Sequence, residues 1–207
     1  MFKSKQKIFV IGRNKTGTTS VGAALRQAGY NVAPQEPAEL MLSDWEKRDF
    51  RRIVKFCQKY EVFQDIPFSL AYTYQILDYV FPGSKFILTV RDSSEQWFES
   101  VTRFHTKIIA KNRLPTVDDL KEFPYIYKGW LWAAEQAVYG VNENTLYNRL
   151  VYVDQYESHN NQVREYFRRR KGDLLVINLT ESNAGEKLGL FLRHKSSIEM
   201  PHLNKST

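Results

Sequence analysis

Residues 8–20 (IFVIGRNKTGTTS) constrain the fold of this chain more than any other stretch. The first four are apolar and mostly β-branched, which predicts a buried strand. The chain then passes Gly12 and Gly17 into residues 21–29, where apolar side chains repeat at helical spacing up to Gly29. A strand, a glycine-bearing loop and a helix point backbone N–H groups and the positive end of a helix dipole at one anion. The sequence therefore predicts a phosphate or sulfate site in this loop.

The order of residues inside the loop indicates which anion it fits. A Walker A loop reads G-x-x-x-x-G-K-[ST], with its lysine directly after the second glycine. Here Gly12 and Gly17 keep that spacing, but Thr18 stands in the lysine's place and Lys15 comes earlier. This order resembles the 5′-phosphosulfate loop of sulfotransferases that use 3′-phosphoadenosine 5′-phosphosulfate (PAPS). On the residues alone, a tight turn with incidental polar side chains stays an alternative.

Composition is typical of a globular protein and leaves the ligand open. The 207 residues are 43% apolar and 26% charged, which predicts one domain over residues 1–207 with a core that needs no disulfide or metal. The one cysteine, Cys57, is expected to be a small buried side chain. A net charge of +7 favours a polyanionic ligand, and it fits a nucleotide and a nucleic acid equally.

Membrane and export signals are not evident in the sequence. Eighteen apolar residues never run together, and the basic residues 1–7 pass directly into the first predicted strand without the apolar core of a signal peptide. We therefore expect a soluble, cytoplasmic protein without a membrane span.

Strands and helices alternate along the chain. The patterns predict strands at residues 8–11, 61–65, 85–90 and 174–178, and helices at about 21–29, 45–60, 69–80, 94–111, 126–139, 145–170 and 184–192. This alternation favours a three-layer α/β fold of the P-loop NTPase type, with a small, mainly parallel sheet between helices. Lys15, Asp65 and Arg91 each follow a predicted strand. Because ligands bind beyond the carboxyl ends of such strands, we expect all three in one cleft.

Residues 81–100 (FPGSKFILTVRDSSEQWFES) strengthen the resemblance. The stretch is similar to that of a short-chain subfamily of PAPS-dependent sulfotransferases, in which a strand ends in an arginine and the next helix carries a serine. The resemblance implies that Arg91 and Ser100 hold the 3′-phosphate. The pairs Asp65…Pro67 and Pro201-His202 also fall where that subfamily has similar residues.

The chain departs from the subfamily at this second site. The arginine and serine are usually eight apart, whereas Arg91 and Ser100 are nine apart, with Ser93 and Ser94 where one proline is common. Either the turn absorbs the extra residue, or Ser93 or Ser94 takes the place of Ser100. A salt bridge between Arg91 and Asp92 is the plain structural alternative.

The resemblance also implies how the residues divide the work of sulfuryl transfer. Lys15 would stabilise the leaving phosphate, and Asp65 would be the general base, with His105 as second choice and His159 and His202 as weaker candidates. A helix N-cap or an ion pair would equally explain Asp65. No metal is expected. The donor-binding residues would be Arg13, Asn14, Lys15, Thr16, Gly17, Thr18, Thr19, Ser20, Arg91 and Ser100.

Three other functions stay open at this point. A small-molecule or nucleotide kinase shares the first loop but needs the Walker lysine. A nucleic-acid-binding module would need its basic residues clustered, whereas here they are dispersed among acids. A sulfotransferase that has lost turnover is the third. We expect a small-molecule or glycan acceptor, held by residues 35–60 and 104–147, and no nucleic-acid partner; the sequence leaves the acceptor's identity and the oligomeric state open.

Overall fold

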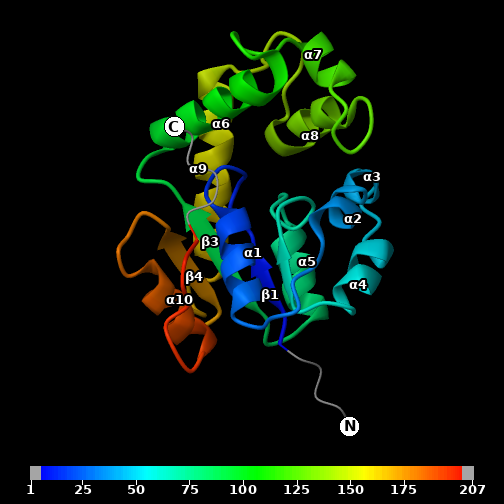
Figure 1. The fold of residues 1–207 in the computed structure, drawn as a ribbon. Coiled ribbons are helices and arrows are strands. Elements are labelled where there is room, and N and C mark those ends of the chain that lie inside the picture. Colours follow the sequence, from blue (N-terminus) through cyan, green and yellow to red (C-terminus); the bar gives the residue numbers. More distant parts are fainter. Residues whose placement is uncertain (1–5, 202–207) are drawn as a thin grey trace.

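A computed structural model describes residues 6–201 of the chain (Figure 1). Its sheet has the order β2-β1-β3-β4, and every neighbouring pair is parallel. The strands are β1 (Ile8–Val10), β2 (Val62–Gln64), β3 (Lys85–Val90) and β4 (Leu174–Asn178). Since β1 lies between β2 and β3, the loops that follow these three strands emerge side by side. The predicted α/β fold with a parallel sheet is confirmed.

Helices cover both faces of the sheet because side chains of β1 alternate between two cores. Ile8 and Val10 pack with α1 (Thr18–Gln27) and α10 (Ala184–Leu192). Phe9 and Ile11 face a larger core. That core contains the buried Cys57 and includes side chains from α3 (Leu42–Glu46), α4 (Arg51–Cys57), α5 (Thr73–Val80) and α9 (Arg149–Tyr166). This alternation of period two gives the predicted three layers.

A group of helices rises above the carboxyl edge of the sheet (Figure 1). A third core of Trp97, Val101, Tyr139, Val141, Tyr152 and Tyr156 joins α6 (Ser94–His105), α8 (Trp130–Tyr139) and α9. A π-helical turn, η1 (Thr106–Ala110), continues α6, and α7 (Val117–Glu122) begins with a capping box of Thr116 and Asp119. These helices form a cap over the strand ends.

Several predicted helices are shorter or divided, and backbone conformation explains where. The helix expected at 45–60 is two helices, because Arg48 adopts a left-handed φ of 56° between α3 and α4. Tyr72 (φ 48°) and Gly129 (φ 89°) likewise delay the starts of α5 and α8. A further helix, α2 (Gln35–Glu39), lies between the helices predicted at 21–29 and 45–60. Within residues 6–201, no helix is long and apolar enough to cross a membrane.

Candidate active site

A cavity of about 340 Å³ lies between the carboxyl edge of the sheet and the cap. Lys15, Asp65 and Arg91 all line it, so the three strand exits open into one space, as the sequence predicted. The other lining residues from the first loop are Arg13, Asn14, Gly17, Thr18, Thr19 and Ser20.

The two loop glycines are required for different reasons. A Cβ atom on Gly12 would lie 2.0 Å from Oγ1 of Thr89 on β3, because the loop passes directly over that strand. Gly17 has a φ of 100°, a left-handed conformation that favours glycine, and it caps the N-terminus of α1. Thr16 lies beneath the loop, where its hydroxyl donates to the Arg13 carbonyl and shares a 2.6 Å hydrogen bond with Thr89. Thr16 therefore shapes the loop and does not line the cavity.

Arg13 and Asn14 fix the loop to the surrounding helices. Arg13 is buried, donates to the Ser69 carbonyl at 3.0 Å, and has its pKa lowered by burial to about 10, so it stays charged at neutral pH. The Asn14 carbonyl accepts a hydrogen bond from the Trp97 indole at 2.9 Å. The Asn14 side-chain oxygen accepts one from the Tyr139 hydroxyl at 2.7 Å. Helices α6 and α8 thus hold the loop from the cap side.

Lys15 supplies a cation whose charge is poorly compensated. Its φ is 61°, and its Nζ lies 3.6 Å from the centre of the Phe104 ring on α6. Burial, and secondarily the positive charge of Arg91, lower the pKa of Lys15 to about 8. Burial disfavours the charged form of this ammonium, and a bound anion would favour it again. The site therefore suits an anionic ligand.

Arg91 binds the loop directly. Its Nε donates to the Lys15 carbonyl at 2.7 Å, and its backbone N–H donates to the Tyr156 hydroxyl at 3.0 Å. The alternative salt bridge to Asp92 is not observed, because Asp92 instead accepts hydrogen bonds from Gln96 and Asn178. Among residues 6–201, no carboxylate pairs with Arg91, so its outer nitrogens are available to a phosphate.

The three serines after Arg91 are placed less favourably than expected. Ser93 is the N-cap of α6, and its hydroxyl accepts the Gln96 N–H at 3.1 Å. The Ser94 hydroxyl donates to Glu157 at 2.6 Å. Ser100 lies on α6 and is not among the described residues that line the cavity. The structure thus brings Arg91, but not Ser100, to the predicted site.

Two of the proposed bases reach the cavity. Asp65 has a φ of 59°, its Oδ1 accepts the Ile66 N–H at 3.0 Å, and burial raises its pKa. His105, at the end of α6, shares a 2.9 Å hydrogen bond with the Tyr147 hydroxyl through Nδ1. Burial, with a smaller effect of Lys15, lowers the pKa of His105 to about 4, so the ring is neutral at pH 7.

The other two histidines do not line this site. The Nε2 atom of His159 lies 2.8 Å from the carbonyl oxygen of Ile11, and its ring is buried below the loop. His202 lies outside the described residues. Residues 6–201 contain no group of three or more His, Cys, Asp or Glu side chains that could hold a metal ion.

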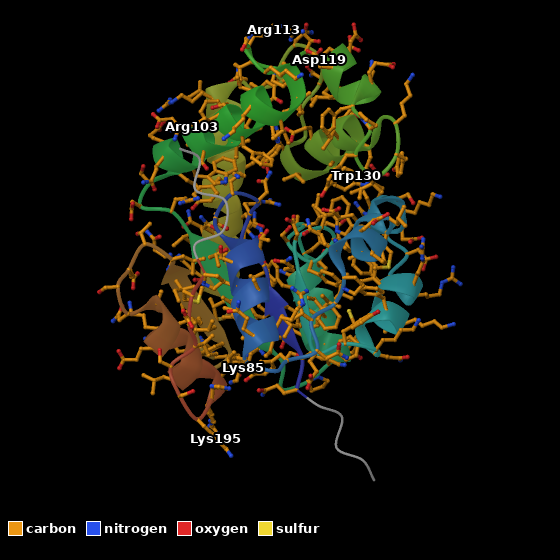
Figure 2. All side chains as sticks on the ribbon, viewed as in Figure 1. Lys85, Arg103, Arg113, Asp119, Trp130 and Lys195 are labelled. Carbon is orange, nitrogen blue, oxygen red and sulfur yellow. The ribbon has the colours of Figure 1, made fainter. Side chains whose placement is uncertain are left out.

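The part of the cavity expected to hold an acceptor includes residues that the sequence did not single out. Residues 104–139 contribute most of it, as expected, but of residues 35–60 only Gln35 and Glu39 take part. Trp130 is buried and donates its indole N–H to the Glu39 carbonyl at 3.1 Å, between α8 and α2 (Figure 2). Trp132 faces another core, in agreement with a spacing of two on a helix. Glu39 ends α2, for which the sequence predicted no element.

Comparison with known proteins identifies the family. A family model described as a sulfotransferase domain matches residues 7–207. No curated protein matches the chain. The match covers the loop, the sheet and the cap together, and it favours sulfuryl transfer over the kinase and nucleic-acid-binding alternatives. Taken with the loop and the parallel sheet, it shows that the chain belongs to the sulfotransferase domain family.

Proposed function

We propose that the protein transfers a sulfuryl group from PAPS to a hydroxyl or amine of a small-molecule or glycan acceptor and releases 3′-phosphoadenosine 5′-phosphate (PAP). The observation that carries this proposal is the shared cavity of Lys15 and Arg91, at the exits of the adjacent strands β1 and β3. Two separate cations on one cavity suit a donor that carries two separate anionic groups.

The donor would bind through the first loop and Arg91. The backbone N–H groups of residues 17–20, at the N-terminus of α1, would donate hydrogen bonds to the 5′-phosphosulfate. The Thr18, Thr19 and Ser20 side chains would add further contacts. The Arg91 guanidinium would bind the 3′-phosphate. Ser100 has no part in the proposal unless α6 shifts toward the cavity.

The reaction needs charge stabilisation and one proton acceptor. The acceptor oxygen forms a bond to sulfur as the bond from sulfur to the bridging phosphate oxygen breaks, and the electron pair of that bond stays on the phosphate. The Lys15 ammonium would stabilise the resulting charge on PAP. The acceptor's proton passes to the base, so the products are a sulfate ester, PAP and a proton. The proposal gives no role to a metal ion.

Asp65 is the preferred base over His105. Burial raises the pKa of Asp65, which makes its carboxylate a better proton acceptor than an exposed one. Burial lowers the pKa of His105 to about 4, which makes its ring a weaker acceptor at neutral pH. The buried, unpaired Cys57 is compatible with a reducing compartment, and we keep the cytoplasm as the proposed location.

Thermal unfolding with nucleotides tests the proposal. At saturation and without magnesium, PAP should raise Tm by about 5 °C or more, well above AMP or ATP. Arg91→Ala should weaken PAP binding about tenfold or more and remove most of the protein's preference for PAP over AMP. Arg103→Ala, an exposed arginine on α6, is the matched control and should keep the preference. Equal Tm shifts with PAP and AMP in the unaltered protein would contradict a 3′-phosphate site.

A further inference from the structure

The acceptor part of the cavity contains a buried carboxylate with a free oxygen. Glu39 is 3% exposed and lines the cavity. Its Oε1 accepts hydrogen bonds from Gln35 at 2.8 Å and from the Tyr125 hydroxyl at 3.4 Å. Its Oε2 is buried and has no hydrogen-bond partner among the described residues. A buried carboxylate oxygen without a partner is costly, so this oxygen suits a ligand atom that can donate to it.

The groups around Glu39 supply no positive charge. Burial, together with the negative charges of Asp65 and Glu36, raises the pKa of Glu39 to about 7, although Gln35 and Tyr125 donate neutral hydrogen bonds that lower it. No lysine or arginine within residues 6–201 forms an ion pair with Glu39 or Asp65. This end of the cavity therefore holds carboxyl groups without a paired cation in the described part of the chain, whereas Arg13, Lys15 and Arg91 supply cations to the donor end.

Part of the cavity wall is apolar. Side chains from η1, the segment after α7, and α8 supply it: Ile108, Ile109, Phe123, Leu131, Ala134 and Val138. A wall of this kind fits a hydrocarbon or aromatic body better than a sugar, which would leave its hydroxyls without partners.

We infer that the acceptor is a small aromatic or otherwise apolar alcohol or phenol that carries a protonated amine, which binds the free oxygen of Glu39. This inference rests on the proposed sulfuryl transfer, in which Asp65 receives the proton of the acceptor hydroxyl. The amine would supply the donor that the Glu39 carboxylate lacks, and the apolar wall would enclose the body.

Three phenols that differ in one end group test the inference. Tyramine carries an ammonium group, 4-ethylphenol is its neutral counterpart, and 3-(4-hydroxyphenyl)propanoate carries a carboxylate. With PAPS as donor, kcat/KM should be at least tenfold higher for tyramine than for 4-ethylphenol, and lowest for the carboxylate. Glu39→Gln keeps the shape and removes the charge, so the ratio of tyramine to 4-ethylphenol should fall about tenfold. Glu46→Gln removes the charge of an exposed residue of α3 outside the cavity and should keep the ratio.

Calorimetric binding in the presence of PAP separates this inference from the proposed function, because it needs no turnover. Tyramine binding that weakens about tenfold in Glu39→Gln supports the amine site even if no phenol is sulfated. Tyramine and 4-ethylphenol that bind and react equally, before and after the substitution, would overturn the amine site and leave sulfuryl transfer intact. Better turnover of a neutral methyl glycoside than of tyramine would overturn it as well.

Discussion

The two ends of the cavity are built by different means. Most of the donor end is one continuous loop, residues 12–20, to which the exit of β3 adds Arg91. Some constraints on the loop are local, since Gly17 takes a left-handed conformation and Thr16 bonds to the Arg13 carbonyl, whereas Gly12 packs against Thr89 of β3. The acceptor end comes from α2, η1, the segment after α7, and α8, which are far apart in the sequence. Only a few long-range contacts, such as that of Trp130 with Glu39, join these pieces.

Under the proposed function, this difference would separate the residues that act on the donor from those that select the acceptor. The donor loop is fixed by hydrogen bonds from α6 and α8 to Asn14 and from Arg91 to Lys15. Substitutions there should affect every acceptor equally, because they act on the donor. Substitutions in the acceptor wall should change which acceptor is used, with smaller effects on the rate.

The largest effect is expected for Lys15→Ala. Loss of the ammonium proposed to stabilise the leaving phosphate should lower kcat about a thousandfold, or about 4 kcal/mol, with every acceptor. Lys121→Ala is the matched control, since Lys121 also lies over an aromatic ring, that of Trp132, but outside the cavity. Steady-state rates with two different acceptors measure the loss of kcat in each variant. A loss of kcat with only one of the two acceptors would contradict the assignment of Lys15 to the donor end.

Asp65→Asn and His105→Gln identify the base. The variant that removes the base should lower kcat about a hundredfold and leave PAP affinity nearly unchanged. We expect this result for Asp65→Asn and a smaller effect for His105→Gln. The opposite result would transfer the role to His105, whose low pKa would then have to rise when the donor binds.

Gly12→Ala tests how tightly the donor loop is packed. A Cβ atom 2.0 Å from Thr89 forces the loop or the strand to shift, so we expect a loss of about 2 kcal/mol in the free energy of unfolding. Gly172→Ala is the control, because nothing lies within 4 Å of its added atom and its φ is not left-handed. Urea unfolding of both variants measures the change in the free energy of unfolding. A change in Gly12→Ala as small as that in Gly172→Ala would show that the loop can shift at little cost.

The smallest effect is a proton taken up on binding. With a pKa of about 8, Lys15 is about half neutral at pH 8 in the free protein, and a bound anion should restore its charge. PAP binding should therefore take up about half a proton at pH 8, and affinity should fall as pH rises above 8. Calorimetry in buffers of different ionisation enthalpy measures the uptake. Lys15→Ala should abolish it; an unchanged uptake in that variant would assign the proton to another group.

The fold and the donor end could be predicted because their signals are local. Short runs of apolar, often β-branched residues marked the four strands, and the spacing of Gly12, Lys15 and Gly17 marked the loop. The acceptor end could not be predicted in the same way. Glu39 has no sequence signal, since its role depends on burial under Trp130, and the division of helix 45–60 depends on the conformation of Arg48. The helical position of Ser100 was foreseen, but its distance from the cavity was not.

The ring under the Lys15 ammonium also belongs to the acceptor wall, because Phe104 lines the same cavity. If the proposed donor draws the ammonium away, the face of that ring would become available to the acceptor. The two substrates would then bind in sequence, with the nucleotide entering first and preparing the surface on which its partner lies.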